Sequence, residues 1–242
     1  MQNKKNIIVI MPAYNAEQTV ESTLRAVPLV YDEVLLCDDA SRDNTFVRSE
    51  QLGITTVRHS DNRGYGANQK TLYALAFARD PDVIVMVHPD NQYDTSRIPE
   101  MIEMVRTGAA DMVLGNRMET ALKNKMPWWK YVGNRFLTSI QNKIFNTHLS
   151  EFHSGLRAYN AKALRRAPLQ TFSDDFVFDS EVIAWFLANG HRVREVPVEC
   201  YYNTDVSSVG FTRSAVYGCA TLRTLLRYVC GAYNTRSKKG DL

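Results

Sequence analysis

The sequence contains few cysteines, and none of them stands in a spacing that holds a metal ion. The four cysteines in 242 residues are Cys37, Cys200, Cys219 and Cys230. They form no CxxC pair and no His/Cys cluster, so a structural zinc site is not indicated. Isolated thiols of this kind are typical of a reducing compartment, and we expect a cytoplasmic protein.

Long apolar segments and glycine-rich phosphate loops are also missing. No uncharged stretch reaches the roughly 20 residues that cross a bilayer, so no transmembrane helix is expected. Neither GxGxxG nor a Walker lysine motif occurs, so dinucleotide and P-loop sites are not indicated. Residues 11–19 contain no glycine, which argues against a nucleotidyltransferase.

The net charge of +3 is too small to indicate a nucleic-acid-binding protein. Basic residues are concentrated near the end of the chain, where they suit an anionic surface. These residues are Arg213, Arg223, Arg227, Arg236, Lys238 and Lys239. Hydrophobic residues make up 45% and charged residues 23%, as in an ordinary globular protein, and the length suits one large domain.

The first half of the chain alternates short β-branched runs with longer helical patterns. This alternation predicts βαβ units, and hence an α/β fold with a mainly parallel sheet. The expected strands are residues 7–11, 33–37, 55–58, 83–87 and 111–114. The expected helices are residues 17–26, 66–78 and 96–106.

The second half is less regular. A Lys-rich stretch at 118–127 predicts a mobile loop. Further elements are expected as helices at 129–145 and 179–188 and as an edge strand at 192–202. We expect one domain over residues 1–210, followed by an amphipathic helix and basic tail over 211–242.

Polar residues gather where the expected strands end, which in an open parallel sheet is where ligands bind. Asp38 and Asp39 follow the second strand, and Asp90 follows the fourth. Asp38 and Asp39 suit hydrogen bonds to a nucleotide base, whereas Asp90 suits a hard cation held against phosphates. Each of these residues alone can equally cap a helix. With residues 12–15 after the first strand there are three polar clusters at one edge, which together favour a nucleotide diphosphate site.

Seven short segments occur in a fixed order between residues 6 and 210. They are MPAYNAEQT at 11–19, CDDASRDNT at 37–45, NRGYGAN at 62–68, HPDNQYD at 88–94, GNR at 115–117, HSGLRAYNAKAL at 153–164 and EVPVECYY at 195–202. Together they resemble glycosyltransferase family 2 of the GT-A fold, in its dolichyl-phosphate mannosyltransferase-like, polyprenyl-phosphate glycosyltransferase-like branch. The resemblance implies a Rossmann-like, mixed but mainly parallel sheet flanked by helices.

The resemblance also implies roles for individual residues. Those that would line the pocket for the base and ribose are Pro12, Tyr14, Glu17 and Asp39. Asp90 would be the main ligand of a divalent cation, Mn²⁺ or Mg²⁺, with Gln92 assisting. Arg117 and Lys130 would face phosphate groups. Arg157, in the segment HSGLRAYNAKAL, is expected together with Lys130 at the acceptor site.

His88 stands where the family's acidic metal motif has its first Asp. A neutral imidazole ligates Mn²⁺ and suits Mg²⁺ less well. His88 is therefore either a metal ligand or a neighbour that hydrogen-bonds to Asp90, and the sequence leaves both open.

Two more positions depart from the lipid-phosphate branch. Lys130 replaces an Arg, which keeps the charge but loses bidentate geometry. After EVPV the branch tends to carry Arg and Lys, whereas this chain has Asn203 and Val209. Ser207 and Ser208 remain as polar candidates for the acceptor site.

Breaking the sugar–diphosphate bond builds negative charge on the leaving group, which a cation with Arg117 and Lys130 would stabilise. The resemblance implies in-line attack and inversion, with a polyprenyl phosphate as the leading acceptor. The first alternative is a sugar hydroxyl of a growing glycan, which needs a base. Asp179 or Glu181 would supply it, and only one of them can face the site. The second alternative is an inactive nucleotide-sugar-binding scaffold, suggested by His88.

Residues 211–233 carry apolar side chains broadly on one side of a helix. These are Val216, Cys219, Ala220, Leu222, Leu226, Val229 and Cys230. The pattern suits a helix on an anionic membrane, so we expect peripheral attachment to the cytoplasmic membrane face. It also suits packing on the domain, a membrane partner subunit or a second copy of the chain. Trp128 and Trp129 admit both membrane anchoring and core packing.

Overall fold

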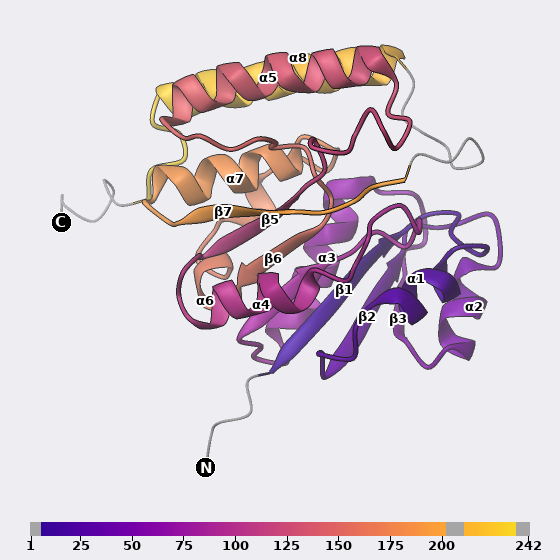
Figure 1. Cartoon of the computed structure of the whole chain (residues 1–242). Helices are drawn as coiled ribbons and strands as arrows, with labels where there is room; N and C mark the ends of the chain where they lie inside the picture. Colours follow the sequence, from indigo (N-terminus) through magenta and orange to yellow (C-terminus); the bar gives the residue numbers. More distant parts are fainter. Residues whose placement is uncertain (1–5, 202–210, 236–242) are drawn as a thin grey trace.

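The computed structural model describes residues 6–201 and 211–235, with the backbone alone for 211–214. Its centre is a seven-stranded sheet in the order β3-β2-β1-β4-β6-β5-β7 (Figure 1). The strands are β1 (Ile7–Ala13), β2 (Glu33–Asp38), β3 (Thr55–Arg58), β4 (Val83–Met86), β5 (Met112–Asn116), β6 (Arg157–Asn160) and β7 (Val193–Pro197). Neighbouring strands run parallel except β6, which is antiparallel to β4 and β5. The expected mixed, mainly parallel sheet is confirmed.

Strand β6 was not expected from the sequence, because its residues RAYN contain no β-branched run. Its conformation comes from its neighbours, since Ala158 lies opposite both Val85 of β4 and Val113 of β5. The reversed direction places Arg157 opposite Met86, near the carboxyl end of β4. The segment that precedes β6 therefore lies at the same edge as the ends of the parallel strands.

Helices cover both faces of the sheet. They are α1 (Val20–Ala26), α2 (Thr45–Gln51), α3 (Tyr65–Phe77), α4 (Ile98–Arg106), α5 (Trp128–Phe145), α6 (Ala161–Leu164), α7 (Phe178–Ala188) and α8 (Phe211–Val229). Alternate residues of β1 enter opposite cores. Ile8 and Ile10 belong to the core that includes α3 and α7, and Val9 and Met11 to the core that includes α1 and α4. Both faces are buried, which explains the continuous apolar run of β1.

Helices α5 and α8 form a further layer outside α7 (Figure 1). They lie side by side and run in the same direction, because Gly218 of α8 lies near Leu137 of α5 and the ring of Tyr228 contacts that of Phe145. Within the described residues, no helix combines the length and the apolar character that a membrane crossing requires.

The strand β3 matches its expected range of 55–58, although its residues TTVR are only partly buried. The helix expected at 17–26 begins only at Val20, and the strand expected at 192–202 ends at Pro197, as the edge strand β7. Residues 118–127 contain turns without a helix or strand. The division at residue 210 stays a prediction.

Candidate active site at the strand ends

Parallel strands bring the polar segments to one edge of the sheet. β2 ends at Asp38, opposite Ala13 at the end of β1, and β4 ends at Met86 on the other side of β1. Asp39 and Asp90 follow β2 and β4, which are two strand spacings, about 10 Å, apart. The two carboxylates expected to share one ligand therefore come after strands that end at the same edge of the sheet.

Asp38 is fully buried and shapes this edge from within. Its Oδ2 lies 3.1 Å from Nε of Arg58, and its Oδ1 accepts a hydrogen bond of 3.0 Å from the backbone N–H of Ser41. These bonds close a turn through Ala40, whose φ is +57°. Asp38 thus supports the turn after β2, and its carboxylate is shielded from a ligand.

Asp39 is also buried, but it keeps some capacity to bind. Its carboxylate accepts hydrogen bonds from His59 Nδ1 at 2.7 Å and from the backbone N–H groups of Arg63 and Gly64 at 2.9 Å. A carboxylate has about four lone-pair sites, so roughly one remains, on Oδ2. Asp39 therefore holds the loop before α3 against the edge and can accept one further hydrogen bond.

The loop after β1 contributes residues of different accessibility. Pro12 is buried at the end of β1, whereas the side chain of Tyr14 is 47% exposed. Glu17 accepts two hydrogen bonds of 3.0 Å from the backbone and side chain of Asn44, which joins this loop to the one after β2. Tyr14 is therefore the most accessible of the three, whereas Pro12 is buried and Glu17 holds the loop to Asn44.

Asp90 sits in a tight loop held against α1. Asn91, with a φ of +55°, donates its backbone N–H to Thr23 Oγ1 at 3.0 Å. Asp90 Oδ1 accepts the backbone N–H of Gln92 at 3.0 Å. Burial raises the pKa of Asp90, and the positive charge of Arg117 acts against this shift. A bound cation would relieve the cost of holding this carboxylate ionised.

His88, two residues before Asp90, is enclosed by aromatic rings and a glycine. The Tyr65 and Tyr93 rings meet it edge-on, with centroids at 5.3 and 6.5 Å. A Cβ on Gly155 would lie 2.6 Å from Cε1 of His88, so a side chain at 155 would collide with the imidazole. Burial lowers the pKa of His88, which keeps the ring neutral at neutral pH.

Hydrogen bonds around Tyr65 select one tautomer of this neutral ring. The Tyr65 hydroxyl lies 3.0 Å from Asp179 Oδ2 and 2.7 Å from His88 Nε2. A carboxylate only accepts, so the hydroxyl donates to Asp179 and accepts from Nε2–H of His88. The lone pair of His88 is then on Nδ1, which makes no hydrogen bond within the part of the chain that the structure describes.

Asp179, at the start of α7, is the centre of a buried polar network. Its Oδ1 accepts from Gln69 Nε2 at 2.9 Å, and its Oδ2 lies 3.2 Å from Nη2 of Arg157. Arg157 is fully buried and also donates to the backbone oxygen of Ser154. In this conformation Arg157 supports Asp179 from below and does not reach the surface where an acceptor would bind.

Glu181 points in a different direction from Asp179, as two positions on a helix require. Its carboxylate accepts hydrogen bonds from the backbone N–H of Ser173 at 2.6 Å, from Arg227 at 2.6 Å and from Tyr233 at 3.1 Å. Glu181 therefore connects α7 to α8 and to the following turn. Of these two acids, Asp179 is the one beside His88.

Arg117 follows β5 and is oriented by a buried acid. Its Nε lies 2.7 Å from Oε1 of Glu151, whose other oxygen accepts the Arg117 backbone N–H at 3.2 Å. Glu151 is fully buried and also accepts from Asn134 of α5 at 2.8 Å. About one sixth of the Arg117 side chain, 16%, remains exposed, and its Nη2 donates a hydrogen bond of 3.2 Å to the backbone oxygen of His153.

Lys130 lies in the first turn of α5, near Arg117. Burial and the positive charge of Arg117 lower the pKa of Lys130. Its Nζ lies 5.3 Å from the centroid of the Trp129 ring. Among the described residues Lys130 has no acidic partner within ion-pair distance. The structure brings Arg117 and Lys130 close together, and two neighbouring cations favour a bound anion; that they face phosphate groups stays a prediction.

Protein side chains alone do not complete a metal site. No group of three or more His, Cys, Asp or Glu suited to a metal ion occurs among the residues that the structure describes. Asp90 and His88 are thus two potential ligands, and Gln92 is a half-buried neighbour. Ser207 and Ser208 lie outside the described residues.

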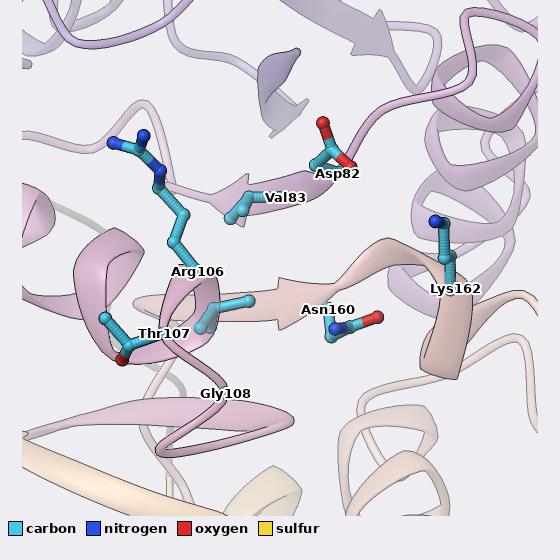
Figure 2. A pocket seen from close by; sticks show the side chains of 8 residues that line it. Asp82, Val83, Arg106, Thr107, Gly108, Asn160 and Lys162 are labelled. Carbon is cyan, nitrogen blue, oxygen red and sulfur yellow. The ribbon is translucent and has the colours of Figure 1, made fainter. Parts of the chain in front are cut away.

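A hollow of about 260 Å³ opens at the other edge of the sheet. Figure 2 shows it where β4 begins, lined by Asp82, Val83, Val105, Arg106, Thr107, Gly108, Asn160 and Lys162. None of the expected site residues lines it. A second hollow of about 450 Å³ includes Arg63, Gly64 and Asp174, and it adjoins the loop that Asp39 holds.

Four residues of the site were not singled out in the sequence. Tyr65, Tyr93 and Gly155 lie inside the segments NRGYGAN, HPDNQYD and HSGLRAYNAKAL, so those segments carried the signal. Glu151 lies outside every such segment. Nothing in the local sequence distinguishes this buried acid from an exposed one.

Comparisons with known proteins identify the family of this chain. The sequence profile described as glycosyl transferase family 2 matches residues 8–167. An uncharacterized protein of Methanocaldococcus jannaschii is 30% identical over 211 residues, covering 86% of each chain. The UDP-N-acetylglucosamine–dolichyl-phosphate N-acetylglucosaminyltransferase of Methanococcus voltae is 26% identical over 217 residues, covering 82% of this chain and 86% of its own.

A solved structure shares the fold. Glucosyl-3-phosphoglycerate synthase from Mycobacterium tuberculosis, in complex with Mn²⁺, UDP and glucosyl-3-phosphoglycerate, is similar with a TM-score of 0.69 at 18% sequence identity. The match covers 93% of this chain and 80% of that one. The profile match and the relatives establish that this chain belongs to glycosyl transferase family 2 and is a glycosyltransferase with the GT-A fold.

Proposed function

We propose that the enzyme transfers a sugar from a UDP- or GDP-linked donor to a polyprenyl or dolichyl phosphate, with inversion at the anomeric carbon. The observation that carries this proposal is the pair of neighbouring cations, Arg117 and Lys130. Glu151 binds Arg117 at 2.7 Å and Asn134, on the helix that carries Lys130, at 2.8 Å. Such an arrangement suits two phosphate groups meeting at one sugar. The Methanococcus voltae relative, by its name, uses UDP-N-acetylglucosamine and dolichyl phosphate.

The donor would lie across the end of β1. The exposed ring of Tyr14 and the remaining lone pair of Asp39 suit the base and ribose. From there a diphosphate reaches toward Asp90, since the two strands concerned are about 10 Å apart. The donor thus spans the sheet edge from β2 to β4.

The residues present fit a divalent cation that takes most of its ligands from phosphate and water. Asp90 supplies a carboxylate, and the tautomer fixed by Tyr65 leaves the His88 Nδ1 lone pair without a protein partner among the described residues. An imidazole ligand favours Mn²⁺ over Mg²⁺. When bound, the cation would stabilise the charge that develops on the leaving diphosphate.

The acidic residues of α7 favour a phosphate acceptor over a hydroxyl. A hydroxyl acceptor needs a general base, but Asp179 is engaged by Tyr65, Gln69 and Arg157, and Glu181 is directed to α8. A phosphate is already a nucleophile and requires no base. In this proposal Lys130 would hold the acceptor phosphate, and Arg117 would hold the diphosphate.

The test is a transfer assay with the purified full chain. Each UDP- or GDP-sugar is supplied with Mn²⁺ or Mg²⁺ and with polyprenyl phosphate, the corresponding polyprenol or an oligosaccharide as acceptor. We expect a glycosylated polyprenyl phosphate by mass spectrometry, with Mn²⁺ preferred, and its loss in Asp90→Asn but not in Asp61→Asn, an exposed aspartate of a turn. Transfer to the oligosaccharide alone would refute the proposed acceptor.

A further inference from the structure

Exposed apolar side chains are concentrated on α5 and α8. Half of the large hydrophobic side chains that are exposed among the described residues belong to these two helices. We call this set the outer apolar surface; it consists of Trp128, Val132, Phe136, Val216, Leu222, Leu226 and Val229. Single exposed apolar residues are normal, but a contiguous set of this kind marks an interaction site.

The two helices present these residues on the same side of the molecule. On α5 the positions 128, 132 and 136 recur every four residues, opposite the buried Asn134 and Thr138. On α8, Leu222 and Leu226 are exposed, whereas Thr221 and Leu225 are buried. Both helices bury their other face on the body of the protein and lie side by side (Figure 1), so the exposed stripes join into one surface.

All charged residues of these two helices are basic. Neither α5 nor α8 contains an Asp or Glu. Their six basic residues are Lys130, Arg135, Lys143, Arg213, Arg223 and Arg227. The whole chain carries only +3, so the rest of the chain is net negative. Basic charge flanking exposed aromatic and aliphatic side chains is the pattern of a segment lying on anionic lipid.

We propose that the outer apolar surface docks on a bilayer that contains anionic lipids. Apolar side chains would enter the boundary of the acyl chains, and the exposed Arg135, Lys143 and Arg223 would face the headgroups, whereas Arg227 pairs with Glu181. A second copy of the chain fits less well, because a two-fold interface places the same patch on both sides and would oppose two acid-free, basic surfaces. This proposal rests on the surface alone and does not depend on the acceptor proposed above.

Docking in this orientation would have a consequence for the active site. Lys130 lies two positions from both Trp128 and Val132, on the opposite side of α5, so docking would hold the phosphate-facing cation about one helix diameter, roughly 10 Å, above the docked face. Tyr217 of α8 contacts His153 Nδ1 at 2.8 Å and Ser180 Oγ at 3.2 Å, which ties the docked helix to the segment below the site. An acceptor phosphate at the membrane would then have to extend past α5 by roughly that distance to reach Lys130.

The experiment measures cosedimentation of the full chain with vesicles of phosphatidylcholine, with and without phosphatidylglycerol and without any polyprenyl phosphate. We expect binding to the anionic vesicles that weakens with added salt. The double variant Phe136→Asp/Leu226→Asp should lower the partition coefficient at least ~10-fold. The matched control is Leu29→Asp, an 89% exposed leucine before β2, which should bind like the wild type.

Two readouts separate this proposal from the others. Both substituted positions are exposed, so we expect an unchanged melting temperature and an unchanged thermal shift with UDP and Mn²⁺ in the double variant. Absence of wild-type binding to anionic vesicles, or equal binding by the double variant, would overturn the proposal. So would a wild-type dimer that the double substitution converts to a monomer with vesicle binding intact, because the surface would then join two copies.

Discussion

Arg117 and Glu151 form an ion pair with a 2.7 Å distance between Nε and Oε1, in which the acid is fully buried and the arginine partly exposed. Glu151 thus fixes the direction of the Arg117 side chain, which in our proposal faces the diphosphate. Asn134 of α5 bonds to the same oxygen, so the end of β5 and the helix that carries Lys130 share one anchor.

Replacing Glu151 by glutamine should therefore damage both stability and activity. The substitution leaves the Arg117 charge poorly compensated in a buried setting, for which we expect a loss of about 3 kcal/mol in the free energy of unfolding. Transfer activity should also fall, by about tenfold, because the guanidinium loses its orientation. Denaturant titration and the transfer assay measure the two effects.

The control for this prediction is Glu33→Gln. Glu33 pairs with Arg79 at 2.6 Å, but both side chains are about one third exposed. We expect a change within about 1 kcal/mol. Equal losses from the two substitutions would show that the buried anchor at Arg117 has no special role.

Lys130→Gln should weaken the use of the acceptor phosphate. The substitution removes the charge and shortens the side chain by one bond, so a charge-assisted contact is lost and kcat/KM for polyprenyl phosphate should fall about 10- to 100-fold. The control is Lys162→Gln, an exposed lysine at the opposite edge of the sheet (Figure 2). An unchanged kcat/KM in Lys130→Gln would remove this residue from the acceptor site.

The fold was predictable to the extent that local patterns determine it. The apolar runs of β1, β2 and β4 are buried on both faces, and such strands are visible in a single sequence. β6 was missed because the strand identity of RAYN comes from its two neighbours in the sheet. Pairing over more than 40 residues leaves no local trace.

The site was predictable in its position but less so in the state of each side chain. The rule that ligands bind at strand ends predicted that Asp39 and Asp90 lie at the same edge of the sheet, and the structure has them there. It gave no information on burial, which depends on tertiary packing. Arg157 and Glu181 have the chemistry of site residues, yet their charges are directed to Asp179 and to Arg227.

The raised pKa of Asp90 leads us to expect that donor binding depends on pH. Burial raises the pKa of its carboxyl, so the group takes up a proton at a higher pH than an ordinary aspartate, and the protonated form does not ligate a cation. Affinity for UDP with saturating Mn²⁺ should therefore fall as the pH is lowered, by up to about tenfold per pH unit.

Asp90→Asn should bind UDP weakly at every pH and keep at most the acid dependence that His88 contributes. Isothermal titration calorimetry across the acid range compares the two proteins. If the variant lost affinity with the same slope as the wild type, Asp90 would not be the titrating ligand.

Gly155 should be required because the imidazole of His88 occupies the place of a side chain. In Gly155→Ala the new Cβ would lie 2.6 Å from Cε1, so the ring must move away from Tyr65. We expect a destabilisation of about 1–3 kcal/mol and a reduced Mn²⁺-dependent thermal shift with UDP.

The glycine of α5 provides the comparison. A Cβ at Gly133 meets nothing within 4 Å, so Gly133→Ala should leave the thermal shift unchanged and stabilise the helix by up to about 1 kcal/mol. A normal Mn²⁺-dependent shift in Gly155→Ala would mean that the position of His88 does not matter for the cation.

His153 should make the folded protein sensitive to acid. Its Nδ1 bonds to Tyr217, and its buried Nε2 has no partner among the described residues. Burial, reinforced by Arg117 and Arg157, lowers the pKa of His153 to about 3. The unfolded chain binds a proton near its ordinary pKa of about 6.5, so the stabilisation is complete above that pH and is lost as the pH falls toward 3.

The expected slope is at most about 1.4 kcal/mol per pH unit for this one group. In His153→Asn the Oδ1 atom can still accept from Tyr217, but the titration is gone, so denaturant unfolding at several pH values should show a shallower acid decline than the wild type. His148→Asn, at an exposed position, is the control and should keep the wild-type slope. The comparison uses the slope of stability against pH, so a constant loss of stability from a cavity beside the smaller side chain does not affect the outcome. Parallel curves for His153→Asn and wild type would show that His153 does not contribute to the acid sensitivity.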